Sequence, residues 1–148
     1  MPILKHSVFI DVPPVRVWHV LANAAQFDLQ SADTREEVTS AQKQGVGTTL
    51  RVVRRIGPLA IVLNGRMTEW GDARVMASEW SSGLPFAIAT RVRMTLAAEK
   101  GGTRLDREYS VEVRLPIVGG IAANFLTRNT PREVQMLMER IKRAAETM

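Results

Sequence analysis

The chain has 148 residues, of which 45% are hydrophobic and 24% are charged. This length fits one domain, and a chain of this size can bury roughly 70% of the surface that it exposes when unfolded. Cysteine is absent, which excludes disulfides, thiolate metal sites and thiol nucleophiles. The sequence has neither an apolar run of about 18 residues nor a secretory signal. We expect one cytoplasmic domain over residues 1–148, without stable membrane insertion.

The charge balance is basic, with 20 Lys and Arg against 15 Asp and Glu and a net charge of +5. Nucleic acid therefore has to be considered as a partner. However, the arginines lie singly or in pairs, as in Arg54-Arg55, Arg91, Arg93 and Arg104. Aromatic residues make up only 5% of the chain, which is a poor supply for base stacking. We expect a solvated basic surface and no nucleic-acid partner.

The first elements are a strand and a helix. Residues 4–12 are rich in apolar side chains and read as a strand that ends before Pro13-Pro14. Prolines suit the first turn of a helix, where a missing N–H costs little. Apolar residues then recur with helical spacing at Val17, Trp18, Val20, Leu21 and Ala24, so 13–29 is predicted as one helix or two short ones.

A long β region follows. Gly and Pro punctuation and β-branched content mark five strands and a weaker sixth, at 47–56, 58–70, 73–82, 86–98, 103–114 and 34–40. Asn64-Gly65 is a favoured hairpin dipeptide, so 58–70 is either two short strands or one. We favour one strand with a bulge or glycine bend, because a curved sheet needs such sites.

Apolar and polar side chains alternate clearly along the last two predicted strands. Ile88, Thr90, Val92, Met94 and Leu96 share one face of 86–98, while Arg91 and Arg93 share the other. On 103–114 the apolar face holds Leu105, Tyr109, Val111 and Val113. The same parity places Arg107 on this apolar face.

The C-terminal segment changes to a helical period. Val134, Leu137, Met138, Ile141 and Ala145 form one face of an amphipathic helix. Thr130-Pro131-Arg132-Glu133 has the form of a capping box, and residues before it also have helical spacing. We predict one long helix over about 118–147, kinked or briefly broken near Pro131.

This order of elements resembles the helix-grip fold of the START-like, or SRPBCC, superfamily. The opening Ser7-Val8-Phe9-Ile10-Asp11-Val12-Pro13-Pro14-Val15-Arg16-Val17-Trp18 is similar to the start of that superfamily, as are Gly45 to Leu50 and Thr68-Glu69-Trp70. The closest branch is the polyketide cyclase/dehydrase and lipid-transport group. The resemblance implies an α+β fold: a curved antiparallel sheet of six or seven strands around a long C-terminal helix, with two short helices after the first strand. It also implies a cavity for a small hydrophobic ligand.

Motifs for other chemistries are missing. His6 and His19, the two histidines, lack metal-ligand spacing, and no G-x-S-x-G elbow is present. Gly45-Val46-Gly47-Thr48-Thr49-Leu50 differs from a dinucleotide fingerprint because its last position is Leu and a strand follows. We expect turn chemistry there, and we expect no metal and no cofactor.

Candidate binding residues are those placed on apolar faces or on the terminal helix: Leu63, Met67, Trp80, Ile88, Thr90, Arg107, Tyr109, Asn124, Phe125 and Arg128. Arg107 could hold an anionic or carbonyl end of a ligand, and Tyr109 could donate a hydrogen bond. Alternatively, Arg107 reaches water at a sheet edge, and Asn124 and Arg128 lie on an exposed helix face.

Three functions stay open. The first is a carrier or sequestering module for a lipid-like or aromatic, polyketide-like ligand. The second is an aromatase/cyclase- or dehydratase-like enzyme in which Arg107 and Tyr109 orient a carbonyl-rich chain. The third is a protein-interaction domain with a vestigial cavity. The scaffold motifs designate no catalytic residue.

Overall fold

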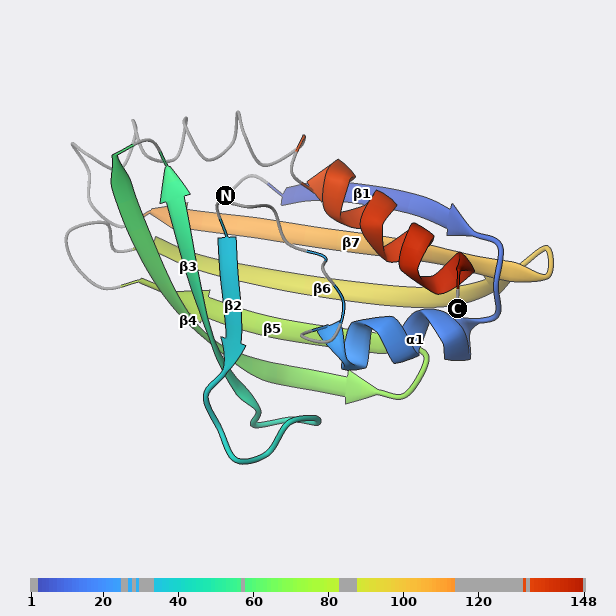
Figure 1. The fold of residues 1–148 in the computed structure, drawn as a ribbon, viewed down its shortest axis with the longest axis horizontal. Coiled ribbons are helices and arrows are strands. Elements are labelled where there is room, and N and C mark those ends of the chain that lie inside the picture. Colours follow the sequence, from blue (N-terminus) through green and yellow to red (C-terminus); the bar gives the residue numbers. More distant parts are fainter. Residues whose placement is uncertain are drawn as a thin grey trace.

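The computed structural model describes residues 3–24, 27, 29, 34–56, 58–82, 88–113, 132 and 134–147. Seven strands form one antiparallel sheet in the order β1-β7-β6-β5-β4-β3-β2. Their bounds are β1 Ile3–Ile10, β2 Thr34–Val38, β3 Thr49–Ile56, β4 Leu59–Gly71, β5 Val75–Ser81, β6 Ile88–Glu99 and β7 Gly102–Val113. The sheet curls around helix α1 (Pro14–Ala22) and the C-terminal helix, whose described part spans 134–146 (Figure 1).

Helix α1 follows from its sequence. Pro13 is the N-cap in extended conformation and Pro14 is the first helical residue, as proline's fixed φ favours. The buried side of the helix carries Val17, Trp18, Val20 and Leu21. The ring of Trp18 meets that of Trp70 on β4 edge to face, with centroids 5.2 Å apart. The helix ends at Ala22, so it covers the first part of the one helix or two short ones predicted over 13–29.

The C-terminal helix is fixed to the sheet by polar contacts at its far end. Lys142 Nζ donates to the carbonyl of Phe9 at 2.9 Å, and a carboxylate oxygen of Glu146 accepts from the backbone N–H of Asp11 at 2.8 Å. The predicted apolar face is confirmed, because Val134, Met138, Ile141 and Ala145 are buried. Residues 118–131, with the predicted kink, lie outside the described residues.

Three described turns use left-handed backbone conformations, one of them at Ala73 between β4 and β5. Lys100 and Gly101 join β6 to β7 with φ values of 50° and 81°, the positive signs that a tight two-residue hairpin requires. Gly45 and Gly47 have φ values of 93° and 95°, and the side-chain amide of Gln42 donates to the carbonyls of Gln44 and Val46. The prediction of turn chemistry around Gly45 is therefore confirmed.

The strand predictions are confirmed to within a few residues. β4 runs unbroken through Asn64-Gly65, and its pairing with β5 shifts between Met67 and Glu69. One strand with a bulge is thus correct, although the bulge lies two residues after Gly65. On β6, Thr90 and Val92 are buried while Arg91 and Arg93 are exposed, so the predicted alternation also holds.

Candidate functional site

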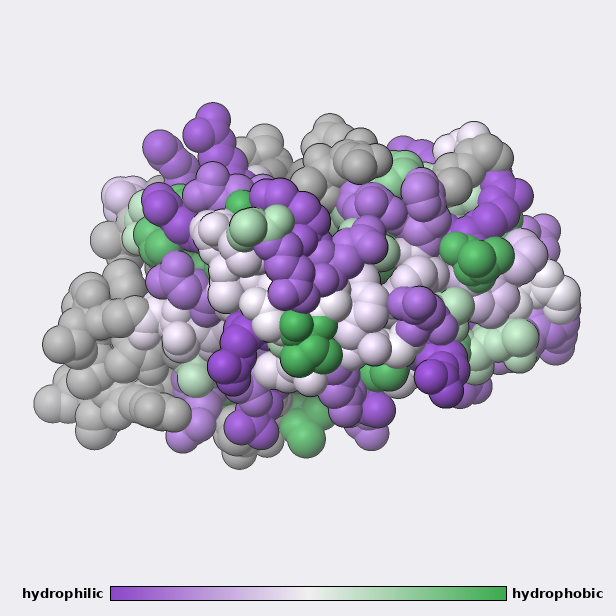
Figure 2. All heavy atoms as spheres, turned by 90° about the horizontal axis from the view of Figure 1, so that it is seen from below, coloured by the Kyte–Doolittle hydropathy of each residue, from purple (hydrophilic) through white to green (hydrophobic). Residues whose placement is uncertain are grey.

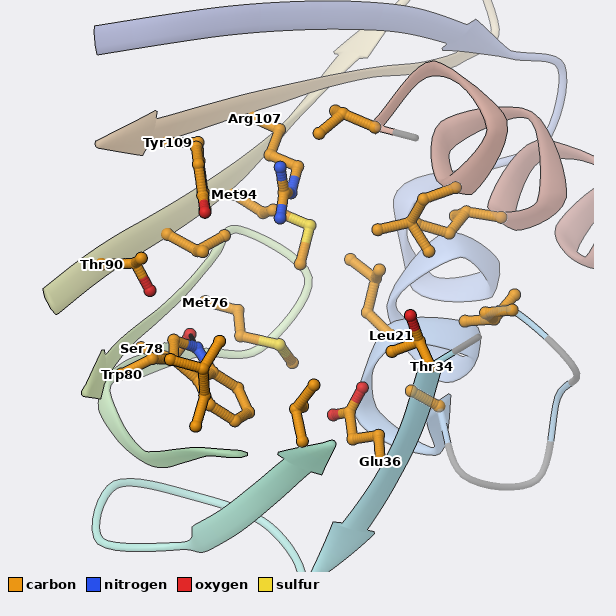
Figure 3. Close-up of a pocket in the computed structure, with 18 of the residues that line it drawn as sticks. Leu21, Thr34, Glu36, Met76, Ser78, Trp80, Thr90, Met94, Arg107 and Tyr109 are labelled. Atoms are coloured by element: carbon orange, nitrogen blue, oxygen red, sulfur yellow. Dashed lines mark hydrogen bonds between the residues drawn. The ribbon is translucent and has the colours of Figure 1, made fainter. Parts of the chain in front are cut away.

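A pocket of about 230 Å³ lies between the concave face of the sheet and the two helices. It is larger than the roughly 150 Å³ engineered cavities that accept benzene, and it lies below the common range of about 300–1,000 Å³ for ligand sites. Figure 3 shows Trp80 and Ser78 of β5, Arg107 and Tyr109 of β7 and Glu36 of β2 around the same space. Strands β2 to β7 all contribute described residues to its wall.

Most of the wall is apolar. From the sheet, flexible and branched side chains line the pocket: Val52, Leu63, Met67, Met76, Val92 and Met94. From the two helices, aliphatic side chains close the opposite side: Leu21, Val134, Leu137 and Ile141. Four of the described residues that line the pocket are methionines, including the half-exposed Met136. Methionine adapts its shape to irregular partners, so this wall can fit apolar molecules of different outlines.

A polar group enters the pocket from β7. Arg107 and Tyr109 lie two residues apart on the inner face, and the guanidinium carbon of Arg107 is 5.2 Å from the centroid of the Tyr109 ring, within cation–π range. Nε and Nη1 of Arg107 are buried and have no hydrogen-bond partner among the described residues. An unpaired buried donor costs about 1–3 kcal/mol. A group that accepts a hydrogen bond from this guanidinium would therefore stabilise the pocket.

Burial also changes the acidity of this pair. The pKa of Arg107 is lowered to about 10, mainly by desolvation, with Tyr109 opposing the shift and the nearby charge of Arg54 adding to it. The guanidinium therefore keeps its charge at neutral pH. Desolvation raises the pKa of Tyr109, which leaves the phenol protonated and able to donate.

Two further arginines and one carboxylate line the described part of the pocket. Arg54 on β3 faces it together with Glu36 on β2, and desolvation lowers the pKa of Arg54. Arg140 of the C-terminal helix donates from Nη1 to the carbonyl of Leu29 at 3.0 Å. Arg54 is therefore half-buried in the pocket wall and is not fully part of the solvated basic surface. Val52 and Val53 give β3 an apolar residue on each face, so alternation could not show which arginine turns inward.

Trp80 depends on a glycine for its position. A Cβ atom added to Gly65 would lie 2.4 Å from Cδ2 and Cε3 of the Trp80 ring, so the ring covers the space that a side chain would fill. Gly65 pairs with Trp80 across β4 and β5. The indole N–H donates to the hydroxyl of Ser78 at 2.8 Å. The ring is thus held in the pocket wall from two sides.

The structure brings most of the predicted residues together. Leu63, Met67, Trp80, Thr90, Arg107 and Tyr109 all line the pocket. Ile88 belongs to β6, but its side chain lies outside the described part of the chain, as do Asn124, Phe125 and Arg128 in full. Sequence reasoning missed Glu36, Arg54, Met76 and Arg140. Helical spacing could have indicated Arg140, because it lies three residues after Leu137, which also lines the pocket.

The described residues offer no group of three metal-binding side chains and no helix suited to cross a bilayer. His6 lies in β1 opposite Arg107, and the carboxamide nitrogen of Asn23 approaches Nδ1 of His19 at 3.4 Å. On the face shown in Figure 2, hydrophobic side chains form small separate patches among hydrophilic ones. Scattered apolar residues of this kind are usual on monomer surfaces.

Comparison with known proteins agrees with the fold. Residues 1–146 match the family model described as polyketide cyclase / dehydrase and lipid transport. The chain belongs to this family. A search of curated proteins gives no significant match.

Solved structures share the helix-grip fold at low sequence identity. The aromatase/cyclase ZhuI from Streptomyces sp. R1128 is 16% identical, with a TM-score of 0.80 over 98% of this chain and 93% of that one. TTHA0849 from Thermus thermophilus is 19% identical, with a TM-score of 0.76 over 97% of both chains. Ara h 8.0201 is 12% identical, with a TM-score of 0.73 over 99% of both.

Proposed function

We propose that this protein binds a small hydrophobic ligand in the pocket between its sheet and its C-terminal helix, as a carrier or sequestering module. The observation that carries the proposal is a mostly apolar pocket of about 230 Å³ with a buried polar pair, Arg107 and Tyr109, at one wall. Apolar walls with few convergent polar groups are typical of ligand sites. The family's description, which includes lipid transport, supports the same proposal.

The first test is a titration with 1-aminoanthracene, a neutral aromatic amine whose fluorescence rises in apolar surroundings. We expect saturable binding to the full chain. Met94→Trp would fill the pocket from β6 and should abolish the signal, because Met94 lines its wall. Thr95→Trp, one residue along on the opposite face of the strand, should bind as the unaltered protein does. Absence of saturable binding to the unaltered protein, or binding that survives Met94→Trp, would contradict the proposal.

A second candidate function is cyclisation or dehydration of a carbonyl-rich chain. The contact between Arg107 and Tyr109 favours it, because a charged guanidinium beside a protonated phenol can polarise a carbonyl and donate a proton. Incubation with a linear poly-β-carbonyl compound tests it by the appearance of an aromatic chromophore. Turnover should disappear in Arg107→Ala with folding intact, and equal product in that variant would exclude this role.

A further inference from the structure

The pocket carries an excess of positive charge. Among the described residues, the guanidinium groups of Arg54, Arg107 and Arg140 line it against one carboxylate, that of Glu36. A cleft with low-dielectric walls and one predominant sign of charge concentrates ligands of the opposite sign. An apolar ligand without charge would gain nothing from this excess.

Arg107 makes no ion pair with any residue that the structure describes. Its partners across the neighbouring strands are His6 on β1 and Met94 on β6, and neither is an anion. On β7 itself the next inward residues are Leu105 and Tyr109. By contrast, several outward-facing arginines are paired, as in Arg93 with Glu69 at 2.9 Å and Arg104 with Asp106 at 3.1 Å.

Buried polar atoms without a hydrogen-bond partner also lie at this position of the sheet. Nε and Nη1 of Arg107 and Nε2 of its neighbour His6 are buried and have no partner among the described residues. A planar guanidinium matches a carboxylate in shape and in donor geometry. A ligand carboxylate would therefore supply both the missing acceptor and the missing negative charge.

We propose that the ligand is an organic acid, an apolar molecule whose carboxylate lies against Arg107 and whose body lies along Met76, Met94 and Trp80. This inference rests on the proposed function and specifies its ligand class. Arg107 selects for charge, because an amide offers an oxygen acceptor but brings no counter-ion. The three apolar side chains select for a body with little polarity.

The test is calorimetric titration at pH 7 with a matched pair, 2-naphthoate and 2-naphthamide, which differ in charge but hardly in shape. We expect naphthoate to bind the full chain at least about tenfold more tightly than naphthamide, as charge-assisted hydrogen bonds require. Arg107→Met should remove the preference while the amide still binds. Arg107→Lys should keep part of it, and Arg104→Met, on the outer face of β7, should keep all of it.

The outcomes separate the two proposals. Equal affinity for both compounds in the unaltered protein, or a preference that persists in Arg107→Met, would overturn the organic-acid inference and leave the hydrophobic-ligand proposal intact. If neither compound nor 1-aminoanthracene binds, both proposals are wrong. Circular dichroism and a thermal melt of each variant establish that a lost preference reflects the site and not unfolding.

Discussion

The guanidinium of Arg107 lies over the ring of Tyr109, 5.2 Å from its centroid, on a sheet face that is otherwise mostly apolar. The pair combines a positive charge with a protonated phenol, because the lowered pKa of Arg107, about 10, still lies above neutral pH and burial raises the pKa of Tyr109. Maintaining this charge in the interior destabilises the ligand-free fold. The buried charge of Arg107 should therefore affect both the stability of the fold and the binding of ligands.

Replacing Arg107 should stabilise the protein. Lowering the pKa of Arg107 from its ordinary value to about 10 corresponds to about 3 kcal/mol of unfavourable free energy for the charged form in the folded state. Loss of the contact with Tyr109 offsets part of the gain. We expect Arg107→Met to raise the free energy of unfolding at pH 7 by about 1–3 kcal/mol in urea denaturation. Arg104→Met should leave it unchanged or lower it slightly. A large loss of stability in Arg107→Met would show that the guanidinium has a partner that the described residues do not include.

The stability difference should depend on pH. At pH 7 the guanidinium is charged in both the folded and the unfolded chain, so the full cost is present. Above about pH 10 the folded protein binds fewer protons than the unfolded one, so its stability rises relative to that of Arg107→Met. We expect the gap between the two proteins in urea denaturation to be constant at neutral pH and to narrow as the pH rises through about 10. A constant gap would contradict the lowered pKa.

Binding of the acid probe should fall over the same range. Deprotonation of Arg107 removes the cation that faces the carboxylate. The other polar groups are Tyr109 on the same strand, His6 on the neighbouring β1, and Arg54 and Glu36 in the pocket wall on β3 and β2. The raised pKa of Tyr109 delays formation of a competing phenolate. We expect the affinity for 2-naphthoate to decline as pH approaches and passes about 10, and that for 2-naphthamide to stay constant. A parallel decline for both would indicate a general loss of the pocket.

Gly65→Ala should disturb the pocket through Trp80. The added methyl group would lie 2.4 Å from the ring, so the indole must move. We expect a loss of about 1–3 kcal/mol in unfolding free energy, as for other overpacked sites, together with a shift in tryptophan fluorescence. In a Trp80→Leu background the same change should cost much less. Equal costs in both backgrounds would show that the glycine acts through the backbone instead.

Thr103 should be important for holding the first helix in place. Its buried hydroxyl donates to the carbonyl of Val12 at 2.7 Å, in the connection between β1 and α1. Thr103→Val keeps the shape but leaves that carbonyl unpaired, which should cost about 1–3 kcal/mol in thermal or urea unfolding. Thr95→Val, on the outer face of β6, is the control and should have little effect.

The fold was predictable from the sequence because its elements have strong local signals. Paired prolines begin α1, glycines end the hairpins, and period-two alternation on the last two strands puts Arg107 and Tyr109 on the inner face. The inward turn of Arg54 was not predictable, because apolar residues occur on both faces of β3. The support of Trp80 by Gly65 was also hidden, since it depends on the pairing of two strands, and neighbours across a sheet have no fixed spacing in the sequence.

The most direct test of the account is a crystal structure of the protein with 2-naphthoate. We predict the naphthyl rings in the pocket against Met94 and Trp80, with a carboxylate oxygen within about 3.2 Å of a guanidinium nitrogen of Arg107. An empty pocket, with naphthoate bound only on the outer face of the sheet, would contradict the account.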